Sequence, residues 1–334
     1  MIVRALKPVR IGSIRIDNPT ILAPMSGVTD MPYRRLVKRH GAGLVVSEMI
    51  ASRATVIEAR KAMKKAVHTA EEYPASVQLA GCDPEIMAEA ARLHEQSGAA
   101  IIDINMGCPA KKVTNGYAGS ALMQDESKAA KIMEAVVKSV NLPVTLKMRT
   151  GWDESSRNAP VLARIAQNCG IQAISVHGRT RCQFYQGRSD WPFIGEVKSA
   201  VGIPVFGNGD VNTVEDARNL LQISGVDGIM VGRGTYGRPW FLEQIRHFLD
   251  TGQKRPAPAL KDQCNIIIEH FDALLSHYGV SVGLRIARKH LGWYSKGLPN
   301  SAVFRGAVFK LTEPHEVRRL LRHFYASRTS RRAA

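Results

Sequence analysis

Residues 99–109 read AAIIDINMGCP, an apolar, β-branched run that ends in polar residues, a glycine and a thiol. Its near-continuous apolar character is expected for a strand of a parallel sheet that is covered on both faces. The preceding segment, Glu85–Gln96, is an amphipathic helical segment that Asp83 can cap, with Pro84 at the first helical position. Gly98 then separates helix from strand, where a left-handed C-cap is needed. One helix–strand unit is therefore predicted around residue 100.

Runs of this kind recur every 25 to 40 residues or so, with amphipathic helical segments between them. Eight strands are predicted, at residues 20–25, 44–49, 75–80, 99–105, 143–149, 173–178, 204–208 and 228–232. Eight strand–helix units in about 240 residues are typical of a (β/α)8 TIM barrel, an α/β fold. An open doubly wound sheet is the alternative, although it rarely has eight such regular units.

The pattern changes after Trp240, where strand-like runs stop. A proline-rich link at residues 255–258 leads into segments of helical periodicity. We therefore expect two domains, a barrel over residues 1–245 and a small all-helical C-terminal domain over residues 256–328.

The chain is strongly basic, with a net charge of +17. Residues 241–334 hold 16 Lys and Arg against 7 Asp and Glu, whereas residues 1–240 hold 30 against 22. Such a balance favours a polyanionic partner, and it is concentrated in the helical part of the chain. Scattered surface charge that only keeps the protein in solution is the alternative.

The five cysteines are widely spaced and form no CxxC pair. This spacing argues against a disulfide framework and a zinc site, and it favours a reducing compartment. No stretch of the sequence approaches the roughly 20 apolar residues of a membrane span, and no signal peptide is recognisable. We expect a cytoplasmic monomer that binds neither a membrane nor a metal.

The predicted strands end in polar, glycine or thiol residues. In TIM barrels the catalytic groups lie at these carboxyl ends, and the last two strands commonly bind phosphate there. Those two ends read GNG at residues 207–209 and GRG at residues 232–234. Glycine lets backbone N–H groups approach a phosphate, and Arg233 adds a charged donor. Two ordinary tight turns are the alternative.

Three side chains at other strand ends are candidate cofactor contacts. Lys147 in a barrel mouth needs an anion, such as a reduced flavin, or else a salt bridge to Glu48 or Asp103. Gln78 offers a donor and an acceptor to a ring edge such as a flavin pyrimidine. His177 is a candidate phosphate donor or general acid, against the structural role that is usual for histidine.

Cys108 lies between Gly107 and Pro109 on the loop after the fourth predicted strand. An isolated cysteine is more often an inert small hydrophobe. A thiol on a rigid, exposed loop at a barrel strand end instead favours a chemical role. No Ser-His-Asp pattern and no zinc pattern in the sequence compete with it.

Several motifs together resemble those of the tRNA-dihydrouridine synthases. They are APMSGVTD at residues 23–30, DINMGCP at 103–109, GSAL at 119–122, HGRT at 177–180 and NGD at 208–210. In the tail, ARKH at 287–290 and WY at 293–294 resemble the B-type bacterial subgroup. The resemblance covers essentially the whole barrel, and the combination is far more specific than any single motif.

This resemblance implies an FMN-dependent oxidoreductase that reduces the 5,6 double bond of uridine in the tRNA D-loop, with NADPH as reductant. The residues it implies for FMN are Pro24, Met25, Ser26, Gln78, Lys147, His177, Asn208, Gly209, Asp210, Gly232 and Arg233. Asn105 and Arg149 would orient the uracil, and Cys108 would protonate C5 of the base. The one departure is Ser26, where alanine is common in the family, and that contact uses the backbone.

The resemblance also makes the helical domain the expected tRNA-binding domain. Arg288 and Lys289 are the first candidate contacts, followed by Arg285, Lys296, Arg305, Arg318, Arg319 and Arg322. A solvated helical face is the alternative for each of them. Trp293 and Tyr294 are candidates for base stacking, although core packing is expected for at least one.

Two other functions remain open at this point. An FMN barrel acting on a free small molecule, such as a dihydroorotate or dihydropyrimidine dehydrogenase, would share the flavin residues but have no use for a basic helical domain. An RNA-binding or regulatory protein on a non-catalytic barrel would show damage to the flavin residues or to Cys108, and the sequence shows none.

Overall fold

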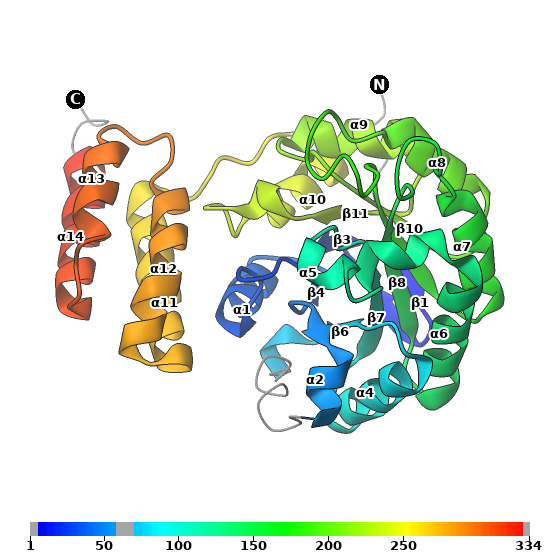
Figure 1. Ribbon diagram of the computed structural model, residues 1–334. Coiled ribbons are helices and arrows are strands. Elements are labelled where there is room, and N and C mark those ends of the chain that lie inside the picture. Colours follow the sequence, from blue (N-terminus) through cyan, green and yellow to red (C-terminus); the bar gives the residue numbers. More distant parts are fainter. Residues whose placement is uncertain (1–5, 58–69, 330–334) are drawn as a thin grey trace. The chain divides into compact units, whose positions relative to one another are not determined.

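The computed structural model describes residues 6–57 and 70–329 of the 334-residue chain (Figure 1). The chain divides into two compact units. The first runs up to Gly234 and also includes Leu242–Lys254. The second comprises Thr235–Phe241 together with the residues from Arg255 onward.

In the described part of the chain, the first unit is a closed barrel of eight parallel strands with helices around its outside (Figure 1). The strands follow one another in sequence order, and pairing of β4 with β6 closes the ring. They are β3 (Thr20–Leu22), β4 (Leu44–Val46), β6 (Ala75–Ala80), β7 (Ile101–Met106), β8 (Val144–Arg149), β9 (Ala173–His177), β10 (Val205–Asn208) and β11 (Gly228–Val231). The predicted TIM barrel is confirmed, and the open sheet is excluded.

Helices follow the strands as the sequence predicted. They are α1 (Met31–Arg39), α2 (Ser52–Ile57), α4 (Pro84–Gln96), α6 (Glu126–Ser139), α7 (Ala159–Asn168), α8 (Trp191–Ser199), α9 (Val214–Ser224) and α10 (Phe241–Thr251). The side chain of Asp83 caps α4, and Thr213 caps α9. Gly225 ends α9 with a φ of 65°, the left-handed conformation expected of a glycine C-cap. A short strand that was not predicted, β5 (Ile50–Ala51), pairs with the end of β6.

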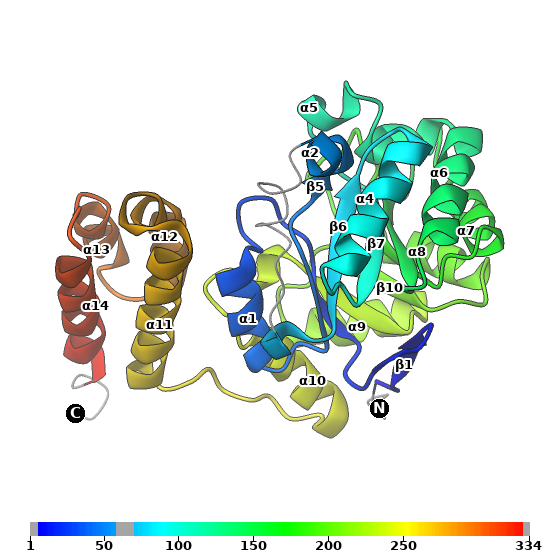
Figure 2. The ribbon, with the colours of Figure 1, turned by 90° about the horizontal axis from the view of Figure 1, so that it is seen from below.

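The interior of the barrel is apolar toward the amino ends of its strands. Ile101, Ala173 and Phe206 form one buried cluster with Ile11 and Ile16. The last two belong to an antiparallel hairpin of β1 (Val9–Ile11) and β2 (Ile14–Ile16). Figure 2 shows β1 at one end of the strands and α5 (Lys111–Thr114) at the other. Burial of each large aliphatic or aromatic side chain of this cluster stabilises the fold by roughly 1.5–3 kcal/mol. Because the cluster provides the apolar core at the amino ends of the strands, the carboxyl ends can carry polar groups.

The second unit is helical, as predicted for the C-terminal part of the chain. Its helices are α11 (Leu260–Tyr278), α12 (Val280–Tyr294), α13 (Ser301–Val308) and α14 (Pro314–Thr329). Phe271, Leu291 and Phe324 lie in its buried core. The helices α11 and α12 approach closely at Gly283, where a Cβ would lie 2.8 Å from the carbonyl oxygen of Leu274. Within the described residues, no helix is both long and apolar enough to cross a membrane.

Candidate active site

Polar side chains from neighbouring strands share the interior face at the carboxyl end of the barrel. The strand register aligns Gln78 with Asp103 and Asp103 with Thr145, and two residues further along it aligns Asn105 with Lys147. Because side chains alternate between the two faces of a strand, both rows point to the same side. Six predicted site residues belong to such rows: Gln78, Asn105, Lys147, Arg149, His177 and Asn208.

The Cys108 loop is held by hydrogen bonds at both of its sides. The Asn105 side-chain oxygen accepts from the backbone N–H of Gly107 at 3.2 Å and from that of Cys108 at 3.0 Å. The Cys108 carbonyl accepts from the backbone and the hydroxyl of Ser120, at 3.1 and 2.8 Å. Gly119 permits this contact, since a Cβ there would lie 2.8 Å from the same carbonyl oxygen. The half-buried thiol therefore sits on a fixed loop rather than in a core.

Gln78 links this loop to a buried carboxylate. Its Nε2 donates to Oδ2 of Asp103 at 2.7 Å, and its Oε1 accepts from Nδ2 of Asn105 at 2.7 Å. The other carboxylate oxygen of Asp103 accepts from the Thr145 hydroxyl at 2.6 Å. Burial raises the pKa of Asp103, although these two hydrogen bonds and the charge of Lys147 act in the opposite direction. The sequence indicated Asp103 only as an alternative ion-pair partner of Lys147, and it indicated no role for Thr145.

Lys147 is a buried cation, with 9% of its surface exposed. Its Nζ donates to Oδ1 of Asn208 at 3.3 Å, and the described residues give it no ion pair within 4.0 Å. The expected alternative of a salt bridge to Glu48 or Asp103 is therefore not formed. Burial first, and then the charge of Arg149, lower the pKa of Lys147 to about 8. A lysine in this state favours an anionic ligand, because an anion would offset the cost of its desolvation.

Arg149 is 1% exposed and links the loop after β7 to the loop after β9 at the mouth of the barrel. Its Nε donates to the Gly107 carbonyl at 2.8 Å, and its Nη1 donates to the carbonyls of Thr180 and Phe184 at 2.7 and 2.9 Å. The Tyr185 ring lies 5.8 Å from the guanidinium carbon. Burial lowers the pKa of Arg149 to about 10, which leaves it charged at neutral pH. Its Nη2 makes no protein hydrogen bond within the described chain and is available to a ligand.

The glycine-rich end of β10 places a carboxylate between two arginines. Asp210 has a φ of 57°, and its Oδ2 accepts from Nη2 of Arg179 at 2.6 Å and from the backbone N–H of Ser189 at 2.8 Å. Its Oδ1 lies 3.8 Å from Nη2 of Arg233. Burial opposes the charged form of Asp210, but these hydrogen bonds and the two arginines lower its pKa overall. Gly209 cannot be replaced without strain, since its φ is 120° and a Cβ would meet the Ser189 hydroxyl at 2.3 Å.

His177 is buried and uncharged. Nη1 of Arg179 lies 3.3 Å from its Nε2, and because a guanidinium only donates, Nε2 accepts and the ring proton is on Nδ1. Burial, followed by the charges of Arg149, Lys147 and Arg179, lowers its pKa well below the usual range. His177 is therefore a neutral donor rather than a cation. Arg179, which is 2% exposed, had been quoted only within the HGRT motif and given no role.

The loops after β3 and β11 meet at Met25 and Gly232. A Cβ on Gly232 would lie 3.3 Å from the Met25 sulfur. Thr29 fixes the loop after β3, since its hydroxyl accepts from the Met25 backbone N–H at 2.9 Å. Pro24 and Met25 are half-buried, and Ser26 is exposed. These residues thus lie on the loop at the carboxyl end of β3, and their contact with a cofactor stays a prediction.

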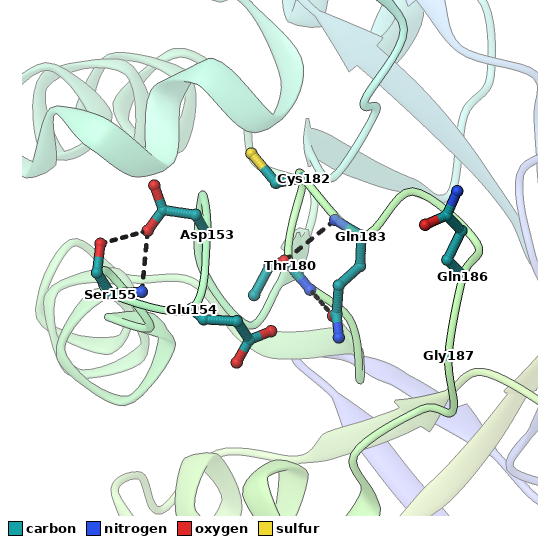
Figure 3. A pocket seen from close by; sticks show the side chains of 8 residues that line it. All are labelled: Asp153, Glu154, Ser155, Thr180, Cys182, Gln183, Gln186 and Gly187. Carbon is teal, nitrogen blue, oxygen red and sulfur yellow. Dashed lines mark hydrogen bonds between the residues drawn. The ribbon is translucent and has the colours of Figure 1, made fainter.

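A pocket of about 580 Å³ that the sequence did not predict opens between the loops after β8 and β9. Figure 3 shows Asp153 hydrogen-bonded to Ser155 on one loop, and Thr180 and Gln183 hydrogen-bonded to each other on the other loop. The lining residues are Asp153, Glu154, Ser155, Thr180, Cys182, Gln183, Gln186 and Gly187. Because the Thr180 carbonyl also accepts from Arg149, this pocket adjoins the arginine that the motifs assign to the substrate.

The candidate tRNA contacts of the helical unit differ in exposure. Arg285 is exposed, whereas Arg288 and Lys289 are half-buried. Tyr294 is buried, as expected for one of the two aromatic residues of its motif, and Trp293 stacks on Tyr236 with 3.9 Å between ring centroids. One further candidate, Arg318, donates to the Asp272 carboxylate at 2.8 Å, so its charge is already partly matched.

A family model described as dihydrouridine synthase matches residues 21–329. The chain belongs to the dihydrouridine synthase family. It is 58% identical over 320 residues to the probable tRNA-dihydrouridine synthase of Rickettsia conorii, covering 96% of this chain and 97% of that protein. It is 48% identical to tRNA-dihydrouridine synthase B of Pseudomonas aeruginosa, with 96% of each chain covered. These findings confirm the family resemblance and the enzyme class predicted from the motifs, a tRNA-dihydrouridine synthase.

Solved structures support the fold. Histamine dehydrogenase from Rhizobium sp. 4-9 matches with a TM-score of 0.58 at 14% identity, covering 81% of this chain and 51% of that chain. A 2-naphthoyl-CoA reductase matches with a TM-score of 0.56 at 14% identity, covering 76% of this chain and 53% of that chain. At such low identity the likeness concerns the barrel architecture alone.

Proposed function

We propose that this chain reduces uridine in the tRNA D-loop in the cytoplasm, using FMN reduced by NADPH, with Cys108 as proton donor. The observation that carries the proposal is the group of cations at the carboxyl end of the barrel. Lys147, Arg149 and Arg179 are each less than a tenth exposed. Buried cations of this kind, next to a thiol on a fixed loop, are expected where an anionic cofactor and a polar base bind.

The end of the site around β10 and β11 fits the phosphate of FMN. Arg233 is about half exposed and ion-paired only loosely with Asp210, so a phosphate can take its place beside the guanidinium. Asp210 would then orient Arg179 and Arg233 rather than touch the phosphate, because two negative charges repel. Neutral His177 would add a donor, and Gly209 keeps the approach free of a side chain.

The middle of the site fits the ring of FMN. Lys147 would place its ammonium at the pyrimidine side, where reduced flavin is negative. Gln78 keeps one amide hydrogen beyond its bond to Asp103, and that hydrogen would donate to a ring carbonyl. Pro24, Met25 and Ser26 would pass along the ring. When bound, FMN supplies the hydride for C6 of the base after NADPH has reduced it.

Two side chains would orient the uracil and one would protonate it. Asn105 uses its oxygen on the Cys108 loop and one amide hydrogen on Gln78, which leaves the other hydrogen for a uracil carbonyl. Nη2 of Arg149 offers a second donor. The Cys108 thiol would give its proton to C5, so that hydride and proton together saturate the double bond. The fixed loop is suited to this task, because a general acid must be held within reach of the atom it protonates.

The substrate base must leave its stack to reach this site, so the surface around the mouth should hold RNA. A rim cluster combines Lys111, Lys112 and Tyr117, which follow the Cys108 loop, with Lys128 of α6. Both Lys111 and Lys112 are exposed, Tyr117 is 71% exposed, and the Lys128 ammonium lies 5.5 Å from its ring centroid. Cations with an exposed aromatic ring suit phosphates and a stacked base. We assign the helical unit to the rest of the tRNA.

The deciding experiment combines a spectrum with an activity assay. Purified protein should show bound flavin and, with NADPH, form dihydrouridine in tRNA that lacks it, but not in free uridine. Bound flavin with no product on any tRNA would overturn the proposal. Turnover of a free pyrimidine in place of tRNA would instead establish the small-molecule dehydrogenase.

A further inference from the structure

Asp103 is a buried carboxylate that the proposed reaction leaves without a role. It is 3% exposed and accepts hydrogen bonds from two neutral groups, the Thr145 hydroxyl and the Gln78 amide. In the described part of the chain it has no salt bridge within 4.0 Å. Burying a carboxylate without an ion pair costs free energy, which calls for a reason beyond packing.

The reason follows from the direction of the hydrogen bonds, read from the Cys108 end. The backbone N–H groups of Gly107 and Cys108 can only donate, so the group of Asn105 that faces them must be its oxygen. The amide nitrogen of Asn105 must then face Gln78, and the side-chain oxygen of Gln78 must accept its hydrogen bond. The nitrogen of Gln78 is consequently turned toward residue 103, where only an acceptor satisfies it. The chain of amides has one allowed direction, and Asp103 stands at its end.

We propose that Asp103 is a positioning residue that fixes the amide direction of Gln78 and, through Gln78 and Asn105, the loop carrying Cys108. A single carboxylate thereby orients side chains on both the cofactor side and the substrate side of the site. Toward the cofactor it decides that Gln78 offers an N–H, and toward the substrate it keeps Cys108 and the free hydrogen of Asn105 in place. Only the catalytic consequence rests on the proposed function, because the ordering of the loop is a property of the protein alone.

Three single substitutions test the acceptor requirement by hydrogen–deuterium exchange of the peptide spanning residues 105–110. Asp103→Leu matches the shape of the side chain but removes the acceptor, and exchange at Gly107 and Cys108 should rise about tenfold. Asp103→Asn keeps an oxygen for Gln78 while its nitrogen donates to Thr145, so exchange should stay within about twofold of the parent protein. Ser76→Ala is the matched control. Ser76 lies on β6, as Gln78 does, its hydroxyl is buried without a hydrogen-bond partner, and its loss should leave the exchange rate unchanged.

The outcomes separate the possible roles of Asp103. Unchanged exchange in Asp103→Leu overturns the proposal. Equal loss in Asp103→Leu and Asp103→Asn overturns it too, since charge rather than hydrogen-bond direction would then matter. Thermal melting of each variant distinguishes a local opening of the loop from unfolding.

A charge swap gives a readout that a merely structural role would not move. In Gln78→Glu two carboxyl groups face each other, and at a pH high enough to ionise both, their repulsion should make the loop exchange about tenfold faster. Adding Asp103→Asn supplies a nitrogen that donates to Glu at position 78, whose second oxygen still accepts from Asn105. The double variant should therefore recover the slow exchange of the loop, yet bind FMN at least about tenfold more weakly, because residue 78 no longer offers an N–H.

Failure of the double variant to slow the exchange relative to Gln78→Glu would overturn the proposal. FMN affinity is read from quenching of flavin fluorescence, and the exchange is measured without FMN or tRNA. If the parent protein bound no FMN, the proposed function would fail, but the exchange data would still test the positioning role of Asp103.

Discussion

The barrel and the helical unit use charged residues in opposite ways. At the carboxyl end of the barrel, Lys147 and Arg149 are buried together with the carboxylate of Asp103. In the helical unit the core is made of apolar residues such as Phe271, and basic residues such as Arg285 lie outside it. Burial of a charge costs free energy, whereas an exposed charge costs little. The buried charges should therefore act on chemistry and cofactor binding, and the exposed ones on the affinity for tRNA.

The largest expected effect is at Cys108. Cys108→Ala should lower tRNA turnover about 100-fold or more, the usual contribution of a general acid. FMN binding and reduction by NADPH should persist, because the loop is held by backbone atoms and Asn105 rather than by the thiol. Stopped-flow measurement of flavin reduction and of its reoxidation by tRNA separates the two steps. Unimpaired reoxidation would remove the proton-donor role.

Lys147 should control FMN affinity and its pH dependence. Lys147→Met removes the buried cation and should weaken FMN binding about tenfold. Because the pKa of Lys147 is lowered to about 8, its ammonium is present below that pH and is lost as the pH rises through it. The affinity of the flavin-free protein for FMN should therefore fall above pH 8. Fluorescence titrations between pH 7 and 9.5 check this, and a variant with the same pH dependence as the parent would contradict it.

The exposed Arg285 and the half-buried Arg288 of the helical unit should affect tRNA binding alone. Arg285→Ala combined with Arg288→Ala should raise KM for tRNA about fivefold and reduce the salt dependence of binding by about one phosphate contact per arginine removed. The rate of flavin reduction should not change. Lys138→Ala, at an exposed lysine at the end of α6, serves as the control. Slower flavin reduction in the arginine variant would contradict the division of roles, in which the barrel carries the chemistry and the helical unit only binds tRNA.

The rim cluster tests whether exposure or membership of a unit decides the effect. Lys111→Ala combined with Lys112→Ala lies on the barrel, yet both side chains are exposed. The pair should behave like the arginines of the helical unit, with a KM for tRNA raised about threefold and FMN affinity unchanged. Steady-state kinetics at two salt concentrations show the effect, which should shrink at high salt. A change in FMN affinity would show that position, not exposure, is what matters.

Much of the fold followed from patterns that are local in the sequence. The run at residues 99–105 predicted a strand, and the structure has β7 at Ile101–Met106. The cap at Asp83 was recognisable because a capping side chain bonds to N–H groups only two or three residues away. The short β5 was missed, since two residues carry no periodicity.

The site was recognised less completely than the fold. Gln78, Asn105, Lys147 and Arg149 were singled out as polar groups at strand ends or through motifs, but their partners were not. Arg179 was overlooked although it binds both His177 and Asp210. Tyr185, over which the Arg233 guanidinium lies at 4.6 Å, had no assigned role. The contacts of Arg179 with Asp210 and of Arg233 with Tyr185 join residues from different loops, so no spacing along the chain records them.

The sequence by itself determined the eight-strand barrel, the helical C-terminal part, the family and the thiol at Cys108. Each of these rests on periodicity, composition or a contiguous motif. Only the tertiary structure decided that Lys147 bonds to Asn208 rather than to a carboxylate, and that Asp103 ends a chain of amides leading to Cys108. The physical reason is that strand register and closure of the barrel bring side chains from separate strands together in its interior. Hydrogen-bond direction then leaves those side chains a single arrangement.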